Sequence, residues 1–216
     1  MSQTAARCRL VALISGRGSN LQAILDGAAD GTLPIDPIAV ISNRPGALGL
    51  ERAHNAGVPA ATLDHREFTT REMFEKSLAE LIQRQEPDLV ILAGFMRKLG
   101  PHFVDRYRGC MMNIHPSLLP KFRGLNTHAR AIASGARVHG ASVHFVTPDL
   151  DAGPVILQAE VPVLPDDDAQ TLAERVLVQE HRIFPLAIKW FAEGRIGLQG
   201  DRVLFDNQPL AAPIVL

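Results

Sequence analysis

The sequence predicts an α/β protein with a mostly parallel, twisted sheet flanked by helices, and with antiparallel strands in the C-terminal half. Short apolar runs alternate with longer amphipathic segments through the first half, the pattern of strand–helix–strand units. The run 89–93 is entirely apolar, as expected of a central strand covered on both faces. Two later runs, 141–146 and 155–161, are joined by a loop that suits an antiparallel pair and not a helical crossover.

The elements of the first half follow from this alternation and from start and stop signals. Strands are expected at 9–14, 35–42, 60–63 and 89–93, and helices at 19–26, 46–56, 69–85 and 101–107. Ser19 with Gln22, and Thr69 with Glu72, have the spacing of capping boxes, so Ser19 and Thr69 are predicted to cap their helices.

The second half is predicted to be organised differently. A strand is expected at 111–115, a helix at 127–134, the two antiparallel strands, and a long helix at 168–192. Pro185 inside that last helix predicts a kink. A small hairpin is expected around 200–201. No repeat or linker interrupts the chain, so we expect a single domain over 1–216, with an N-terminal extension (1–8) and a C-terminal tail (195–216).

Composition excludes several classes of protein. Of the 216 residues, 46% are hydrophobic and 21% charged, which excludes a wholly disordered chain. The formal net charge is −1, so the basic excess of a nucleic-acid-binding protein is missing. No apolar run approaches the roughly 20 residues of a membrane-spanning helix. The two cysteines, Cys8 and Cys110, are expected to be reduced thiols in a cytosolic protein.

A glycine-rich loop joins the first strand to the first helix. Its sequence, Ser-Gly-Arg-Gly-Ser-Asn at 15–20, is similar to a dinucleotide fingerprint, but Leu21 replaces the third glycine and no suitable acidic residue ends the second strand. A nicotinamide cofactor is therefore rejected. Close backbone approach and N–H groups at a helix start still favour a phosphate near Gly18, Ser19 and Asn20. The alternative is a tight turn with a good cap.

The strand 111–115 ends in two polar side chains on one face. Asn113 and His115 are two residues apart and should project together, where an amide donor beside a histidine suits a developing oxyanion. The alternative is a hydrogen-bonded structural histidine. The loop 149–154 offers Asp149 or Asp151 to hold the histidine charged, although Asp and Gly are also ordinary turn residues.

The remaining histidines give weaker signals. His144 alternates with Ser142 on one strand face, so it either lines the same crevice as His115 or is a satisfied sheet histidine. The spacing of the histidines at 115, 128, 139 and 144 is not that of a metal site, so no metal is expected.

Five segments together resemble one family. They are 13–22, 92–97, 113–120, 142–146 and 150–158. In this order they are similar to the phosphoribosylglycinamide formyltransferases, and the likeness runs from about Arg9 to Gly194. Asn-Ile-His-Pro-Ser-Leu-Leu-Pro at 113–120 is shared by the wider formyl-transfer family, whereas Ser-Gly-x-Gly-Ser-Asn is more specific.

The resemblance implies a Rossmann-like formyltransferase fold and a reaction. The formyl group of 10-formyltetrahydrofolate passes to the amine of glycinamide ribonucleotide, giving formylglycinamide ribonucleotide and tetrahydrofolate in de novo purine biosynthesis. We expect a cytoplasmic monomer or weak homodimer that binds these two small molecules, without a metal, a nucleic acid or a membrane. The alternative is a 10-formyltetrahydrofolate hydrolase or another formyltransferase of the same fold, such as methionyl-tRNA formyltransferase.

The resemblance also implies roles for individual residues. Asn113, His115 and Asp151 are the catalytic set, supported by His144, and the family pattern selects Asp151 over Asp149. The ribonucleotide is implied to bind Gly18, Ser19, Asn20 and Glu180. The folate is implied to bind Arg71, Met96, Arg97, Lys98, Leu99, Asn113, Val146 and Asp149. Lys98 departs from a usually apolar position, Asn126 replaces a histidine of some members and is given no proton role, and a cis bond is implied before Pro120.

Overall fold

The computed structural model describes residues 7–216 and divides the chain into two compact units, Met1–Arg97 and Lys98–Leu216. Most of the expected N-terminal extension (1–8) lies outside the described residues, and Cys8 belongs to the first strand. The expectation of a single domain over 1–216 stays a prediction. No helix within residues 7–216 is long and apolar enough to cross a membrane.

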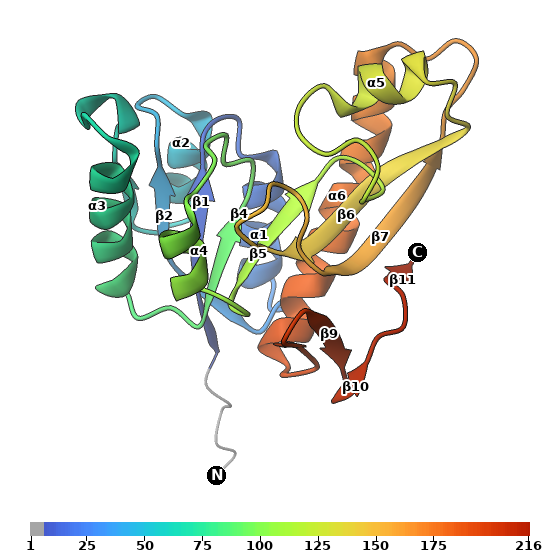
Figure 1. The fold of residues 1–216 in the computed structure, drawn as a ribbon. Helices are drawn as coiled ribbons and strands as arrows, with labels where there is room; N and C mark the ends of the chain where they lie inside the picture. Colours follow the sequence, from blue (N-terminus) through green and yellow to red (C-terminus); the bar gives the residue numbers. More distant parts are fainter. Residues whose placement is uncertain (1–6) are drawn as a thin grey trace. The chain divides into compact units, whose positions relative to one another are not determined.

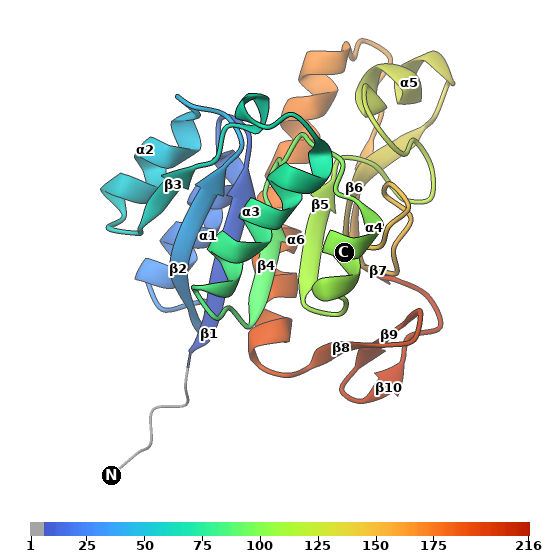
Figure 2. The same ribbon diagram turned by 60° about the vertical axis from the view of Figure 1, so that its left-hand side comes forward.

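The first unit is a parallel sheet with helices on both faces. Its elements are β1 (Cys8–Ile14), α1 (Ser19–Ala29), β2 (Ile35–Ser42), α2 (Leu48–Asn55), β3 (Ala60–Thr62), the 3-10 helix η1 (His65–Glu67), α3 (Arg71–Gln83) and β4 (Leu89–Leu92). The strand order is β4-β1-β2-β3 and every pair is parallel. Figure 2 shows α3 on one face of these strands and α1 on the other, and α2 packs beside α1.

The core of this unit explains its apolar runs. The strand β1 lies between β2 and β4, and residues 10–14 are fully buried. The strand β4 is buried along its whole length, as the uninterrupted run at 89–93 predicts. Because all four strands are parallel, their carboxyl ends meet at one edge, and the loops after β1, β2 and β4 share it.

The structure corrects both predicted helix caps in this unit. The helix α1 begins at Ser19 itself, and the preceding Gly18 is left-handed with φ 69°; no side chain caps this end. A Cβ at Gly18 would lie 2.7 Å from the Gly49 Cα, so the close approach of α2 requires glycine there. In α3 the cap is Thr70, whose Oγ1 accepts from the Met73 N–H, whereas the Thr69 hydroxyl lies against the sulfur of Met73.

The second unit contains the expected antiparallel strands. Its elements are α4 (Pro101–Arg106), β5 (Met111–His115), α5 (Thr127–Ala133), β6 (Val138–Phe145), β7 (Val155–Pro162), α6 (Ala169–Ala192), β8 (Ile196–Gln199), β9 (Arg202–Phe205), β10 (Gln208–Pro209) and β11 (Ile214–Val215). The order is β5-β6-β7-β11, with β6 antiparallel to both neighbours and β11 parallel to β7. The long helix α6 packs along β6 and β7 (Figure 1). The predicted fold class is therefore confirmed.

The C-terminal tail forms the predicted hairpin and adds one strand to it. The strands β8 and β9 pair antiparallel around residues 200–201, and β10 pairs with β9. The edge of Trp190 meets the ring of Phe205 at a centroid distance of 5.0 Å, and the Arg195 guanidinium lies over the same ring. These contacts attach the small sheet to the end of α6.

The long helix α6 begins where the sequence predicts, with a capping box that sequence inspection missed. Asp168 accepts hydrogen bonds from the backbone N–H groups of Gln170 and Thr171, and the Thr171 hydroxyl accepts from the Asp168 N–H. Threonine replaces the usual Glu or Gln of this motif, which hid the signal. The helix continues through Pro185; the kink expected there stays a prediction.

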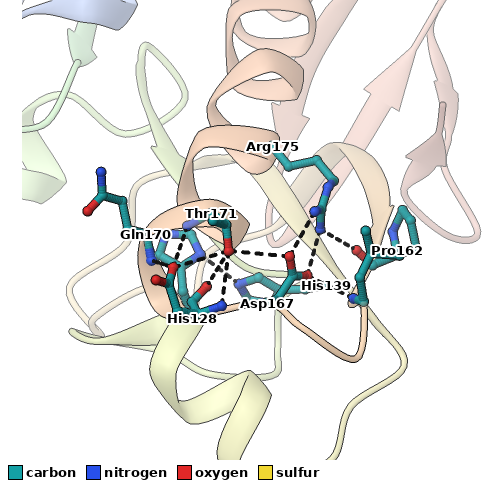
Figure 3. A network of polar contacts seen from close by, with 9 residues as sticks. His128, His139, Pro162, Asp167, Gln170, Thr171 and Arg175 are labelled. Carbon is teal, nitrogen blue, oxygen red and sulfur yellow. Dashed lines mark hydrogen bonds and ion pairs between the residues drawn. The ribbon is translucent and has the colours of Figure 1, made fainter.

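An arginine fork supports the segment just before this cap. Arg175 donates from both terminal nitrogens to the Asp167 carboxylate, at 2.7 and 2.8 Å, and also to the Pro162 carbonyl at 2.9 Å (Figure 3). Hydrogen bonds from Arg175 hold the pKa of Asp167 well below its usual range. The bidentate geometry ties the end of β7 to the first turns of α6.

Candidate active site

The strand β5 places two polar side chains on one face. Its antiparallel register with β6 sets Asn113 opposite His144 and His115 opposite Ser142. Because strand side chains alternate, Asn113 and His115 project together while Ile114 packs on the other side. His115 is only 6% exposed, so its ring nitrogens depend on protein partners.

Asn113 contacts His144 in a defined orientation. The Asn113 Nδ2 lies 3.1 Å from the His144 Nε2, and the His144 Nδ1 lies 2.9 Å from the Phe145 carbonyl oxygen. A carbonyl only accepts, so Nδ1 carries the proton and Nε2 accepts from the amide. Burial lowers the pKa of His144 to about 4, which agrees with this neutral ring.

His115 faces an acceptor at each ring nitrogen. Its Nε2 lies 3.1 Å from the Phe122 carbonyl oxygen, and its Nδ1 lies 3.4 Å from the Asp151 Oδ2. Only the doubly protonated imidazolium donates on both sides. The structure thus brings together the histidine and the carboxylate that the sequence paired, and it provides a second acceptor that the sequence did not reveal.

Asp151 is held by the loops that follow β5 and β6. The backbone N–H of Gly124 donates to its Oδ2 at 2.9 Å, and its Oδ1 lies 3.9 Å from the His144 Nε2. Asp151 adopts φ 48°, a left-handed conformation, and its side chain is 9% exposed. Asp149 is exposed, so of the two carboxylates the structure places Asp151 beside His115.

The turn after β5 is fixed by buried hydroxyl and amide groups. The Leu119–Pro120 bond is cis, as predicted. The Ser142 hydroxyl accepts from the Leu119 N–H at 3.0 Å and donates to the Ser117 carbonyl at 2.6 Å, and Gln158 donates to the Leu119 carbonyl. This network anchors the turn on β6 and β7.

A pair of histidines lies beyond the turn, and sequence inspection missed it. The His139 Nε2 and the His128 Nδ1 are 3.2 Å apart (Figure 3), and the ring of His139 meets the edge of Phe122. Burial, with the neighbouring His128 second, lowers the pKa of His139 to about 4. Within residues 7–216, no three His, Cys, Asp or Glu side chains gather as a metal site.

The buried histidines predict a loss of stability in mild acid. His139 and His144 have pKa values of about 4 when folded, against an ordinary 6.5, so between these pH values the unfolded chain binds more protons. Each histidine is worth up to roughly 3 kcal/mol over that window. We expect the thermal unfolding midpoint to fall from pH 7.5 to pH 5, and to fall less in His139→Gln. An equal fall in the two proteins would contradict this prediction.

The predicted ribonucleotide residues lie in both units. Gly18, Ser19 and Asn20 come together at the start of α1, where the Gln22 N–H already bonds the Gly18 carbonyl. Arg52 of α2 donates to the Arg17 carbonyl at 2.9 Å and steadies this loop. Glu180 is a buried residue of α6 in the second unit, and its contact with a ribonucleotide stays a prediction.

The predicted folate residues fall into two groups as well. In the first unit, Arg71 pairs with Glu75 of α3 at 3.6 Å, and the Arg97 guanidinium lies 4.9 Å from the Phe74 ring centroid. Met96 is exposed, yet its N–H donates to the Ser15 hydroxyl at 2.7 Å.

In the second unit, Leu99 is buried and Lys98 exposed. The Val146 N–H bonds the Met111 carbonyl, while Asp149 stays exposed in the loop that follows. The roles of the residues in both groups stay predictions.

Several residues of these sites escaped the sequence patterns. The Phe122 carbonyl and the Gly124 N–H are backbone groups, for which residue type carries almost no signal. Gly153 had a signal, because a glycine in a turn often marks the close approach of two backbones. A Cβ there would overlap the Phe145 carbonyl oxygen and lie 3.3 Å from the His144 Nδ1.

Comparison with known proteins identifies the class first. The family model described as formyl transferase matches residues 8–188, and the chain belongs to this family. Its relatives narrow the class. The phosphoribosylglycinamide formyltransferase of Escherichia coli (strain K12) is 50% identical over 201 residues, which cover 93% of this chain and 95% of the relative.

Solved structures agree with this assignment. The phosphoribosylglycinamide formyltransferase of Coxiella burnetii is 50% identical, with a TM-score of 0.93 over 97% of this chain and 99% of that chain. A formyltetrahydrofolate deformylase from Burkholderia mallei is also similar, with a TM-score of 0.85 and 30% identity. The aligned region covers 94% of this chain but 72% of that structure. The deformylase is therefore the less similar of the two.

Proposed function

We propose that the protein transfers the formyl group of 10-formyltetrahydrofolate to the amine of glycinamide ribonucleotide, in de novo purine biosynthesis. The products are formylglycinamide ribonucleotide and tetrahydrofolate. The observation that carries the proposal is the cluster of Asn113, Asp151 and the buried His115 in a chain of this family. The hydrolase alternative is not favoured, because the deformylase is only 30% identical.

The cluster suits attack of an amine on a formyl carbon. The amine adds to that carbon, and the formyl oxygen becomes an oxyanion. Asn113 has two N–H groups and gives one to His144, so the other serves the oxyanion. The Nε2–H of His115, donated to Phe122 in this structure, turns to the oxyanion while Nδ1 stays with Asp151.

Collapse of the tetrahedral intermediate completes the transfer. The bond between the formyl carbon and the folate nitrogen breaks, the amine loses one proton, and that folate nitrogen gains one. Asp151 assists by holding His115 charged and by passing on the proton of the amine. The step needs no oxidant and no reductant.

Substrate binding is assigned to the residues that match the family pattern. Gly18, Ser19, Asn20 and Glu180 hold the ribonucleotide, and Arg71, Met96, Arg97, Lys98, Leu99, Asn113, Val146 and Asp149 hold the folate. The loop before α1 supports the first assignment, because no side chain caps that helix. We further propose a cytoplasmic monomer or weak homodimer that does not bind nucleic acid.

A competition assay tests the proposed function. Purified protein is given 10-formyltetrahydrofolate with glycinamide ribonucleotide, formyl-accepting tRNA and water as possible acceptors. We expect formylglycinamide ribonucleotide to account for nearly all tetrahydrofolate released, with no release when the ribonucleotide is omitted. Release at the same rate without the ribonucleotide would establish a hydrolase instead.

Gly18→Val is expected to weaken ribonucleotide binding and leave folate binding nearly intact. The new Cβ would lie 2.7 Å from the Gly49 Cα and would sit at φ 69°, so the start of α1 must shift. Losing one charge-assisted hydrogen bond to the phosphate weakens binding by roughly ten- to a hundredfold. Isothermal titration with each ligand measures the two affinities.

The matched control for this prediction is Gly16→Ala. No atom lies within 4 Å of a Cβ at Gly16, so the loop accepts a methyl group there. Equal losses of both affinities in Gly18→Val would contradict the phosphate assignment.

A further inference from the structure

A buried polar chain joins the carboxyl ends of three parallel strands in the first unit. Ser15 follows β1, Asn43 follows β2 and Met96 follows β4. The Met96 N–H donates to the Ser15 Oγ at 2.7 Å, and the Ser15 hydroxyl donates to the Asn43 Oδ1 at 2.5 Å. Ser15 and Asn43 are 5% and 1% exposed, so water does not compete for these groups.

Asn43 is itself held in place. Its backbone N–H donates to the Ile14 carbonyl at 3.3 Å, and its carbonyl accepts from the His65 Nδ1 at 2.8 Å. The side-chain oxygen of Asn43 is thus a fixed acceptor. A hydroxyl that donates to a fixed acceptor has its lone pairs fixed as well, so Ser15 presents a defined acceptor to Met96.

The segment that Ser15 holds is only partly buried, because Gly94 and Met96 are exposed and Phe95 and Arg97 are half-buried. Met96 has 63% of its surface exposed, and Gly94 adopts φ 78° in the turn before it. Arg97, the next residue, rests its guanidinium on the Phe74 ring at 4.9 Å. The hydrogen bond from the Met96 N–H to the buried Ser15 hydroxyl therefore fixes the backbone between this turn and Arg97 at one defined point.

We infer that Ser15 and Asn43 are positioning residues for the folate: they act through the backbone at Met96 and determine affinity for the folate and not for the ribonucleotide. The inference rests on the proposed function, which assigns Met96 and Arg97 to folate binding. It adds that Ser15, the first residue of the glycine-rich loop, supports folate binding, whereas Gly18, Ser19 and Asn20 of the same loop are assigned to the ribonucleotide.

Steady-state kinetics and binding of Ser15→Ala test this inference. We expect the KM for 10-formyltetrahydrofolate to rise roughly tenfold, the effect of one lost buried hydrogen bond. The kcat and the Kd for glycinamide ribonucleotide should stay within about twofold. The control is Ser42→Ala, which removes a fully buried hydroxyl at the end of β2 whose partner is the Arg44 backbone.

Asn43→Ala provides a second, milder variant. It keeps the hydroxyl of Ser15 but removes the fixed acceptor, so the KM for the folate should rise less than in Ser15→Ala. Because Asn43 acts through Ser15, the double variant should be no worse than Ser15→Ala alone. If the losses of folate affinity multiply in the double variant, Asn43 acts by another route. That result would overturn the proposed connection from Asn43 through Ser15 to Met96. If Ser15→Ala does not fold, comparison of the folate KM of Asn43→Ala with that of Ser42→Ala still tests the inference.

Amide exchange at Met96 gives a readout that does not depend on turnover. In the full chain, exchange of the Met96 N–H should accelerate in Ser15→Ala and not in Ser42→Ala. A folded Ser15→Ala protein with unchanged folate KM, or with equal losses for both substrates, overturns the inference. Absence of formylglycinamide ribonucleotide from the wild-type assay defeats the proposed function instead, and the exchange experiment remains decisive for the positioning of Met96.

Discussion

Replacement of His115 by alanine is expected to lower kcat by roughly 10²–10⁴-fold, the usual size for a positioned acid or base. The ring nitrogens face the Phe122 carbonyl and the Asp151 carboxylate, an arrangement that suits a positively charged ring, and the proposed mechanism uses that charge to stabilise the oxyanion. Alanine removes that charge and leaves a cavity. The measurement is single-turnover formyl transfer with saturating substrates, which isolates the chemical step from binding.

The Asp151 carboxylate is expected to matter as much as the ring it faces. Asp151→Asn keeps the shape of the side chain but removes the charge 3.4 Å from the His115 Nδ1, so kcat should fall by a comparable factor. Asp149→Asn is the matched control: the same substitution two residues away, on an exposed side chain, should cost little.

The double variant of His115 and Asp151 separates a coupled pair from two independent groups. If the two residues act as a unit, His115→Ala combined with Asp151→Asn should be scarcely slower than either single variant. Losses that multiply would show independent action, and the paired mechanism would have to be abandoned.

The partners of the proposed catalytic pair, His115 and Asp151, show how far sequence reasoning extends. The alternation rule placed Asn113 and His115 on one face because β5 is a regular strand, and the paired strands of the structure confirm this. Asp151 was one of two candidate carboxylates, since alternation says nothing about a loop. In the structure Asp151 adopts a left-handed backbone, which no residue pattern predicted, and its carboxylate faces His115, whereas Asp149 is exposed.

The predicted helix caps, Ser19 and Thr69, were wrong for a related reason. Thr69 and Thr70 are both good caps, and in the structure Thr70 caps the helix while the Thr69 hydroxyl contacts the sulfur of Met73. At α1 the serine with capping-box spacing was one residue too late, because Gly18 took the left-handed position that closes the loop. Local propensity identifies an element, whereas contacts between elements decide its exact end.

Gly153→Ala is the change outside the proposed catalytic pair for which we expect the largest loss of kcat. Gly153 is two residues after Asp151, and its missing Cβ is what lets the loop lie against β6. An alanine there would overlap the Phe145 carbonyl oxygen and come within 3.3 Å of the His144 Nδ1. That same carbonyl accepts the hydrogen bond from the His144 Nδ1–H, so we expect both the loop and the ring to move.

A shift of this kind should lower kcat by at least about 10²-fold, because misplacement of a catalytic group by 1 Å is enough for such a loss. The control is Gly197→Ala, a site with no atom within 4 Å of the added Cβ, which should retain wild-type rates. Circular dichroism at the assay temperature separates a shifted loop from an unfolded chain. Since the loss acts through Asp151 and His144, adding Gly153→Ala to Asp151→Asn should slow the enzyme little further. A folded Gly153→Ala protein with native kcat would mean that this loop adapts to the extra carbon, and that the exact placement of Asp151 does not limit the reaction.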